Sequence, residues 1–164
     1  MKTITEQQLR LEIKRLILFF ILSLIIIGIT TFPIETELSV LIESVKNKDG
    51  WIGAWLTKVF LAIKETNLHY PFMSYGTDWL AFAHIVIAVV FWGPLKDPVK
   101  NKWVIQFGMF ACILVFPFAF VCGAVRHIPF YWQLIDCSFG VIGILPLYIC
   151  YHNILKLEKI INNK

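Results

Sequence analysis

Charged side chains are scarce in this chain of 164 residues: Asp, Glu, Lys and Arg make up 16% of it, and hydrophobic residues make up 58%. Ordinary soluble domains have roughly 45–50% apolar residues, so this composition, with a mean hydropathy of +0.71, excludes such a domain. The four cysteines form no CxxC pair and the histidines no HxxxH spacing, so neither a dithiol nor a zinc site is indicated. A serine elbow and a zincin motif are also lacking, so no motif names a reaction.

Four long apolar runs fill most of the chain, at about residues 16–32, 77–95, 103–122 and 134–151. Crossing the hydrocarbon layer takes about 20 apolar residues in a helix, so each run predicts a transmembrane helix. No small-x-small cleavage site follows the first run, which we therefore interpret as a retained span. The sequence predicts an all-α polytopic membrane protein, with one membrane domain over residues 1–164 and the four spans in an antiparallel bundle.

The link over residues 33–76 is too long for a simple turn and has its own pattern. Apolar residues recur at helical spacing in residues 38–45 and again in residues 52–63, with a turn signal between them at Asn47–Gly50. This pattern predicts two short amphipathic helices. Tryptophans suit the headgroup level of a membrane, so we expect these helices to form an interfacial lid over the outer end of the bundle.

Lysine and arginine are unevenly distributed among the links. With the N-terminus in the cytoplasm, the inner segments hold ten of the 15 basic residues, and the outer segments hold only Lys46, Lys48, Lys58, Lys64 and Arg126. An excess of basic residues in cytoplasmic segments orients membrane proteins, so both termini are predicted to be cytoplasmic. The same rule explains the net charge of +4, and no nucleic-acid partner is predicted.

Three ionisable residues lie within or at the mouth of the predicted spans: Asp78, His84 and Asp136. An ionisable side chain in a membrane segment is costly and by default a functional hypothesis, so these are the candidate catalytic residues, as acids or bases. All three fall in the outer half of the spans. The candidate ligand-binding residues on the same side are Glu35, Tyr75, Arg126 and His127. We expect no comparable polar cluster at the inner end.

Helical phase indicates which of these residues face the bundle. His84 shares a stripe with the small residues Ala81 and Ala88, and Asp136 shares one with Gly140 and Gly143. Small residues on a stripe mark a contact between transmembrane helices, so His84 is expected to face a neighbouring helix and not lipid.

Arg126 is the only arginine outside the N-terminal segment, and its planar guanidinium favours a bidentate bond to a carboxylate. We predict that it pairs with Asp136 or Asp78, leaving His84 to face a small polar cavity. The structural alternative is that these residues only form ion pairs and hydrogen bonds within the protein, because buried charges are usually paired whether or not they have a role in function.

Three functional interpretations remain open. The favoured one is a binding or scaffolding component that holds a protein partner or a lipid at the outer leaflet. The alternative is an intramembrane enzyme, with His84 or Asp136 as base and Arg126 binding an anion. A metal-binding protein is less favoured, because only one histidine lies in a span and no spacing identifies a metal or another cofactor. A transport protein is also less favoured, because the inner half of the predicted bundle offers no ionisable residues for a pathway. A disulfide between Cys122 and Cys137 would be permitted in an oxidising periplasm if their Cα atoms lie within about 7 Å.

A resemblance rests on three blocks of the sequence: Tyr75–His84, Gly93–Trp103 and Ile135–Gly140. Together they resemble a group of small bacterial inner-membrane proteins with four spans, over most of the chain from Phe32 onward. The resemblance implies a bacterial source, location in the inner (cytoplasmic) membrane and the same architecture. It implies no activity, cofactor or catalytic residue.

Overall fold

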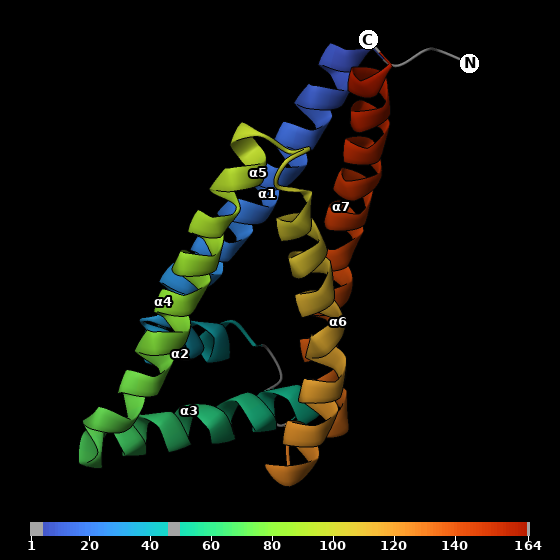
Figure 1. The fold of residues 1–164 in the computed structure, drawn as a ribbon. Helices are drawn as coiled ribbons and strands as arrows, with labels where there is room; N and C mark the ends of the chain where they lie inside the picture. The colour runs from blue at the N-terminus through green and yellow to red at the C-terminus, as the bar shows by residue number, and fades with distance from the viewer. Residues whose placement is uncertain (1–4, 46–49, 164) are drawn as a thin grey trace. The chain divides into compact units, whose positions relative to one another are not determined.

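The computed structural model describes residues 5–45 and 50–163, and within these ranges the regular structure is helical, without a strand. The helices, drawn in Figure 1, are α1 (Glu6–Thr31), α2 (Ile34–Ser44), α3 (Trp51–His69), the 3-10 turn η1 (Pro71–Ser74), α4 (Tyr75–Val90), α5 (Trp92–Lys96), α6 (Lys102–Val125) and α7 (Phe130–Asn162). The prediction of an all-α fold is therefore confirmed.

Four helical segments of the described residues are long and apolar enough to cross a membrane: Glu6–Thr31, Pro71–Lys96, Lys102–Val125 and Phe130–Asn162. Each of them contains one of the four predicted spans, apart from Phe32, which follows the end of α1. Many large apolar side chains on these helices are exposed, among them Leu22, Val89, Phe118 and Val121. Contiguous apolar surface of this kind is rare on soluble proteins, and it suits contact with lipid.

Contacts within the chain divide it into two compact units. Unit 1 comprises Met1–Leu22 and Ala88–Lys164, and unit 2 comprises Ser23–Ile87. Helices α1 and α4 each contribute residues to both units. The single membrane domain and the bundle of four spans stay predictions.

Unit 1 is built around an antiparallel pair, α6 and α7, which lie side by side in Figure 1. Their register is defined by facing residues, because Gly108 lies against Leu147 and Gly140 lies against Cys112. A Cβ atom added at Gly140 would lie 2.7 Å from the carbonyl oxygen of Cys112. Such small residues allow two helix backbones to approach closely in a membrane.

Helices α1 and α7 both extend beyond the predicted spans. Helix α1 begins at Glu6, where Thr5 and Gln8 form a reciprocal capping box: Gln8 N donates to Thr5 Oγ1 at 3.4 Å, and Thr5 N donates to Gln8 Oε1 at 3.0 Å. Buried residues then follow on one stripe of α1: Leu9, Ile13, Ile17 and Ile21. The corresponding buried residues of α7 are Leu147, Cys150, Ile154 and Leu157. These stripes need burial, so both helices continue past their purely apolar runs.

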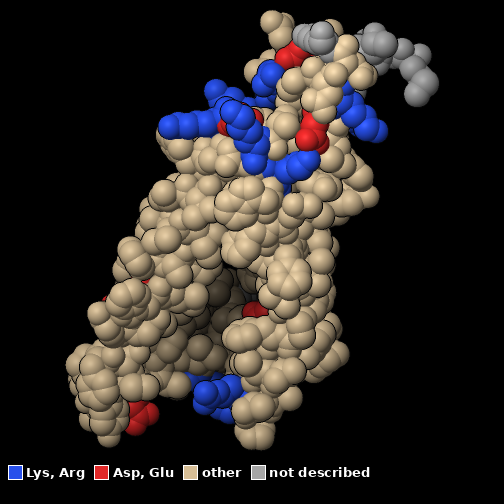
Figure 2. Space-filling view, viewed as in Figure 1, with Lys and Arg blue, Asp and Glu red and all other residues tan. Residues whose placement is uncertain are grey.

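Apart from Arg126, the described Lys and Arg residues of unit 1 gather where α1 begins and α7 ends, in the region of dense blue side chains in Figure 2. We call this region the basic end of unit 1; its members are Arg10, Lys14, Arg15, Lys96, Lys100, Lys102, Lys156 and Lys159. Interhelical polar contacts occur here. Lys102 Nζ lies 2.8 Å from Glu158 Oε1, and Asn153 Nδ2 donates to Glu12 Oε2 at 3.2 Å. The expectation of no polar cluster at the predicted inner end is therefore wrong, since carboxylates there pair across helices.

Unit 2 contains the predicted link as ordered helix, α2 and α3, together with parts of α1 and α4. On α3, Gly53 and Leu56 are buried, and Val59 and Ile63 line a cavity with residues of α2 and α4, including Ile34. These positions follow the predicted apolar stripe. The predicted turn at Asn47–Gly50 lies, apart from its last residue, outside the described residues.

A chain of polar contacts ties the elements of unit 2 together. Asn67 Nδ2 on α3 donates to Glu35 Oε2 on α2 at 2.7 Å. The hydroxyl of Ser74 donates to Asn67 Oδ1, and Thr77 Oγ1 on α4 donates to the carbonyl oxygen of Ser74 at 2.6 Å. These bonds join α2, α3, η1 and α4, and so fix the entry into α4.

Candidate functional site

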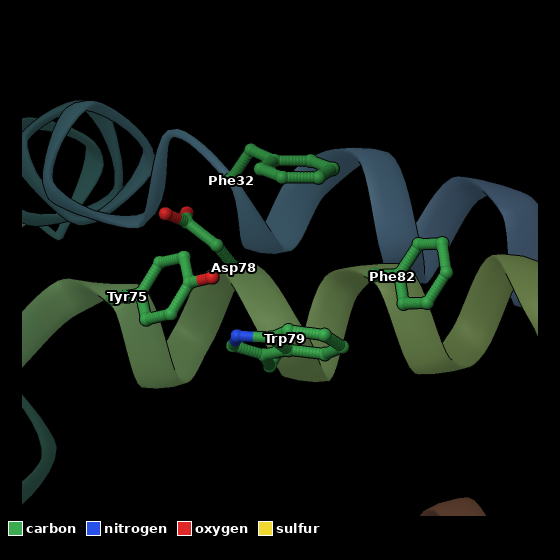
Figure 3. A pocket seen from close by; sticks show the side chains of 5 residues that line it. All are labelled: Phe32, Tyr75, Asp78, Trp79 and Phe82. Atoms are coloured by element: carbon green, nitrogen blue, oxygen red, sulfur yellow. The ribbon is translucent and has the colours of Figure 1, made fainter.

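A pocket of about 280 Å³ lies in unit 2 between the end of α1 and the start of α4. Its lining residues are Phe32, Tyr75, Asp78, Trp79 and Phe82 (Figure 3). Phe32 directly follows α1, and the other four belong to the first turns of α4. They are spaced by three and four residues, so they share one face of the helix. The hydrogen bonds of Asn67, Ser74 and Thr77 fix the start of α4, and they therefore also position the face of α4 that lines the pocket.

The aromatic residues of the pocket form a ladder along α4. The ring centroids of Tyr75 and Trp79 are 5.9 Å apart at an interplanar angle of 83°, and those of Trp79 and Phe82 are 5.7 Å apart at 88°. This edge-to-face arrangement is favoured by the quadrupoles of the rings. The rings remain 52–62% exposed on α4, and that of Phe32 is 49% exposed. Much of their surface is therefore free to contact a ligand.

Asp78 supplies the charge of the pocket. Its carboxylate lies beside Tyr75 and Phe32 and is directed toward α1 (Figure 3). Asp78 stands in the first turn of α4, where the helix dipole stabilises a negative charge. Among the described residues of unit 2, no side chain forms an ion pair or a hydrogen bond with this carboxylate. The pocket thus combines four aromatic rings with a carboxylate that has no counter-ion among the described residues of its unit.

His84 lies on α4, but it is not among the residues that line this pocket. Its Nδ1 is 2.8 Å from the carbonyl oxygen of Leu80, so the ring donates to the backbone of its own helix. A Cβ atom added at Gly28 of α1 would lie 3.3 Å from His84 Cβ and 3.0 Å from the carbonyl oxygen of Ala81, and Ala81 is fully buried. The prediction that this stripe faces a neighbouring helix is confirmed.

Two predicted ligand-binding residues have structural contacts. Glu35 accepts the hydrogen bond from Asn67. His127 ends α6 in the left-handed conformation, at φ 55°. Its N–H donates to the carbonyl oxygen of Ala124 at 3.3 Å, and the N–H of Ile128 donates to that of Gly123 at 2.9 Å. These two bonds define a Schellman motif, so His127 has a structural role as the residue that terminates the helix.

Arg126 and Asp136 both belong to unit 1, and the structure does not pair them. The side chain of Arg126 is exposed, and within the described residues of unit 1 it forms no ion pair with Asp136. Of the two partners predicted for Arg126, Asp136 is therefore wrong. Pairing of Arg126 with Asp78, which belongs to unit 2, stays a prediction.

The turn between α6 and α7 instead contains a buried amide. Gln133 is 7% exposed, and its Nε2 donates to the carbonyl oxygen of Ile128 at 2.8 Å. Gly123 makes room for it, because a Cβ there would lie 2.5 Å from Gln133 Cδ. Gln133, and not Arg126, therefore supplies the polar contact that closes the turn. Sequence reasoning missed it, although a lone glutamine at the entry of an apolar run is a usable signal.

Asp136 lines a separate groove on α6 and α7, with a volume of about 470 Å³. Its other lining residues are all uncharged: Ala111, Leu114, Val115, Phe118, Ala119, Cys122, Gly123 and Ile128. Asp136 is half-buried there. The seven candidate residues thus do not form one cluster in either unit. Tyr75 and Asp78 share a pocket, and Asp136 lies in another environment.

Neither unit assembles a metal site from the residues that the structure describes, because no group of three or more His, Cys, Asp or Glu side chains lies close enough to hold an ion. The four cysteines are free thiols, so the disulfide between Cys122 and Cys137 is not formed. Comparison with protein-family models, with curated proteins and with solved structures finds no match to this chain. The resemblance to small bacterial proteins with four spans stays a prediction.

Proposed function

We propose that this integral membrane protein is a binding component of the bacterial inner membrane, with both termini in the cytoplasm and the Asp78 pocket at the outer leaflet. The observation that carries the proposal is a pocket of aromatic rings around the carboxylate of Asp78, which forms no ion pair or hydrogen bond with a described residue of its unit. The orientation rests on the lysine and arginine distribution, because cytoplasmic segments of membrane proteins carry an excess of these residues. The basic end of unit 1 would then face the cytoplasm.

Two general rules explain parts of the pocket but not the whole. Tyrosine and tryptophan are enriched where a span meets water, which accounts for Tyr75 and Trp79. An acid in the first turn of a helix is stabilised by the dipole, which accounts for Asp78. Neither rule accounts for an accessible cavity that the carboxylate and four rings share. A ligand that fills the cavity and compensates the charge explains all of these features together.

Binding is favoured over catalysis by what surrounds the carboxylate. General acid–base catalysis needs a group within hydrogen-bond reach of the reacting proton, and covalent catalysis needs a nucleophile with an adjacent base. The pocket lining contains neither a second carboxylate nor a histidine, serine or cysteine. His84, the predicted base, donates to Leu80 and lies outside the lining.

The test is identification of molecules that remain bound after purification of the full chain in a mild detergent, by native mass spectrometry. Trp79→Leu removes a large ring of the pocket, and Trp103→Leu is the matched control, since the two side chains are similarly exposed at 55% and 58%. We expect a small molecule or lipid to remain bound to the wild type and to Trp103→Leu, and to be lost from Trp79→Leu. Equal retention of every bound species by both variants would refute binding in this pocket.

A further inference from the structure

We infer that the ligand of the Asp78 pocket carries an organic ammonium group, as a zwitterionic phospholipid headgroup or a free amine does. This inference rests on the proposed binding function and specifies its chemistry. The first argument is charge. The dipole at a helix N-terminus favours negative charge, and the carboxyl group of Asp78 lacks a cationic partner among the described side chains of unit 2. An anionic or neutral ligand would leave it uncompensated in a partly desolvated site.

The lysines described in unit 2 are engaged elsewhere. Lys58 Nζ lies 5.8 Å from the ring centroid of Trp55, and Lys64 Nζ lies 5.9 Å from that of Phe60. Both pairs belong to α3, so these side chains cover aromatic rings of their own helix. Neither of the two described lysines of unit 2 therefore compensates the charge of Asp78.

The second argument is the aromatic lining. The face of an aromatic ring attracts cations, and organic ammonium groups are commonly held by several such rings. A hard metal cation such as Ca²⁺ needs about six to eight oxygen ligands, whereas the pocket offers one carboxylate and the hydroxyl of Tyr75. The lining therefore fits a cation whose charge is spread over C–H and N–H groups, and it disfavours a metal ion.

The third argument is size and position. A volume of 280 Å³ corresponds to roughly nine water-sized groups, at about 30 Å³ each, which suits a small headgroup and not a whole lipid. The pocket lies just after one candidate span ends, at Thr31, and close to the start of the next, at Pro71. Ends of spans lie at the headgroup level of the bilayer. In addition, the last turn of α1 carries no basic residue, so the negative end of its dipole is not neutralised locally.

The experiment measures binding of soluble short-chain phospholipids to the full chain in detergent, by native mass spectrometry with increasing lipid concentration. The probes are the dihexanoyl forms of phosphatidylethanolamine, phosphatidylcholine and phosphatidylglycerol. Free ethanolamine and choline form separate arms. We expect at least one ammonium lipid to bind about tenfold or more tightly than phosphatidylglycerol, given the strength of a charge-assisted contact combined with cation–π contacts. Free amines that bind as well as the lipids would support the same chemistry with a soluble source.

Variants separate charge from shape. Asp78→Asn keeps the size of the side chain and should abolish the preference for ammonium ligands, whereas Asp78→Glu should retain it. Glu37→Gln is the matched control, because it makes the same chemical change in the first turn of α2, outside the pocket. It should leave the preference unchanged, and equal melting temperatures of the variants would show that each one folds.

The outcomes distinguish the inference from the function on which it rests. If phosphatidylglycerol binds as tightly as the ammonium lipids and Trp79→Leu weakens all of them alike, the pocket binds lipid but the ammonium inference is wrong. The same conclusion follows if Asp78→Asn keeps the wild-type preference. If no probe binds in a manner that depends on Trp79, both the inference and the binding function in this pocket are refuted.

Discussion

Replacing Gly140 by alanine tests the close approach of α6 and α7. An added Cβ atom would lie 2.7 Å from the carbonyl oxygen of Cys112 and 3.3 Å from Cε2 of Phe116. Ordinary van der Waals contact begins at 3.4 Å, so the helices would have to separate locally by 0.7 Å (3.4 minus 2.7). The obstacle is backbone, and no change of side-chain rotamer relieves it.

The expected magnitude follows from two opposing terms. Overpacking a well-packed contact costs about 1–3 kcal/mol, and alanine is favoured over glycine within a helix by about 0.5–1 kcal/mol. Gly140→Ala should therefore lower the free energy of unfolding by up to about 2.5 kcal/mol. Gly76→Ala is the matched control, because no atom lies within 4 Å of a Cβ added at this position of α4. This control should show only the stabilisation of about 0.5–1 kcal/mol that alanine gives over glycine within a helix.

The assay is equilibrium unfolding in detergent micelles with increasing sodium dodecyl sulfate, followed by far-ultraviolet circular dichroism. Gly143→Ala sharpens the test, because there the nearest atom is Cys112 Sγ, at 2.9 Å. Adding Cys112→Ala should restore the stability of Gly143→Ala but not that of Gly140→Ala, since only the former is obstructed by the side chain. If Gly140→Ala unfolds at the same midpoint as Gly76→Ala, the argument from the close backbone contact is wrong.

Two further predictions concern the end of α6 and the orientation. His127→Gly should raise the free energy of unfolding by up to about 1–2 kcal/mol, because glycine adopts φ 55° without strain, whereas His127→Ala should give no such gain; a less stable glycine variant in the same unfolding assay would contradict the capping role. Reporter fusions after Lys100 and Lys156 should give cytoplasmic signals, and a fusion after Lys48 should give a periplasmic signal. A periplasmic signal at Lys100 would overturn the proposed orientation and the placement of the pocket at the outer leaflet.

The lengths of α1 and α7 show which helix ends a local sequence pattern does not predict. The apolar runs locate the four spans, but a rule based on runs ends each span where polar residues begin. Helix α1 nevertheless starts at Glu6, and α7 continues to Asn162. Leu9 and Leu157 are buried beyond the runs, because one apolar stripe is sufficient to keep a helix packed after its opposite face turns polar.

Part of the pocket lining could be predicted from the sequence. Tyr75 and Asp78 were candidates from the sequence, and Trp79 and Phe82 share their face of α4 by simple periodicity. Phe32 was not predictable as a lining residue, because it follows a different helix. Its position depends on the register of α1 against α4, which close contact at Gly28 sets.

The sequence by itself determined the helical class, the four apolar spans and the residues that share a face within each helix. These properties depend on composition and on periodicity over a few turns, which are local. The tertiary structure decided which faces meet and which polar groups become partners. Glu158 pairs with Lys102, Asn67 bonds to Glu35, and Gln133 bonds to the backbone of Ile128. Such partnerships depend on the register between helices, which is set where glycine lets two backbones touch and which no local pattern encodes.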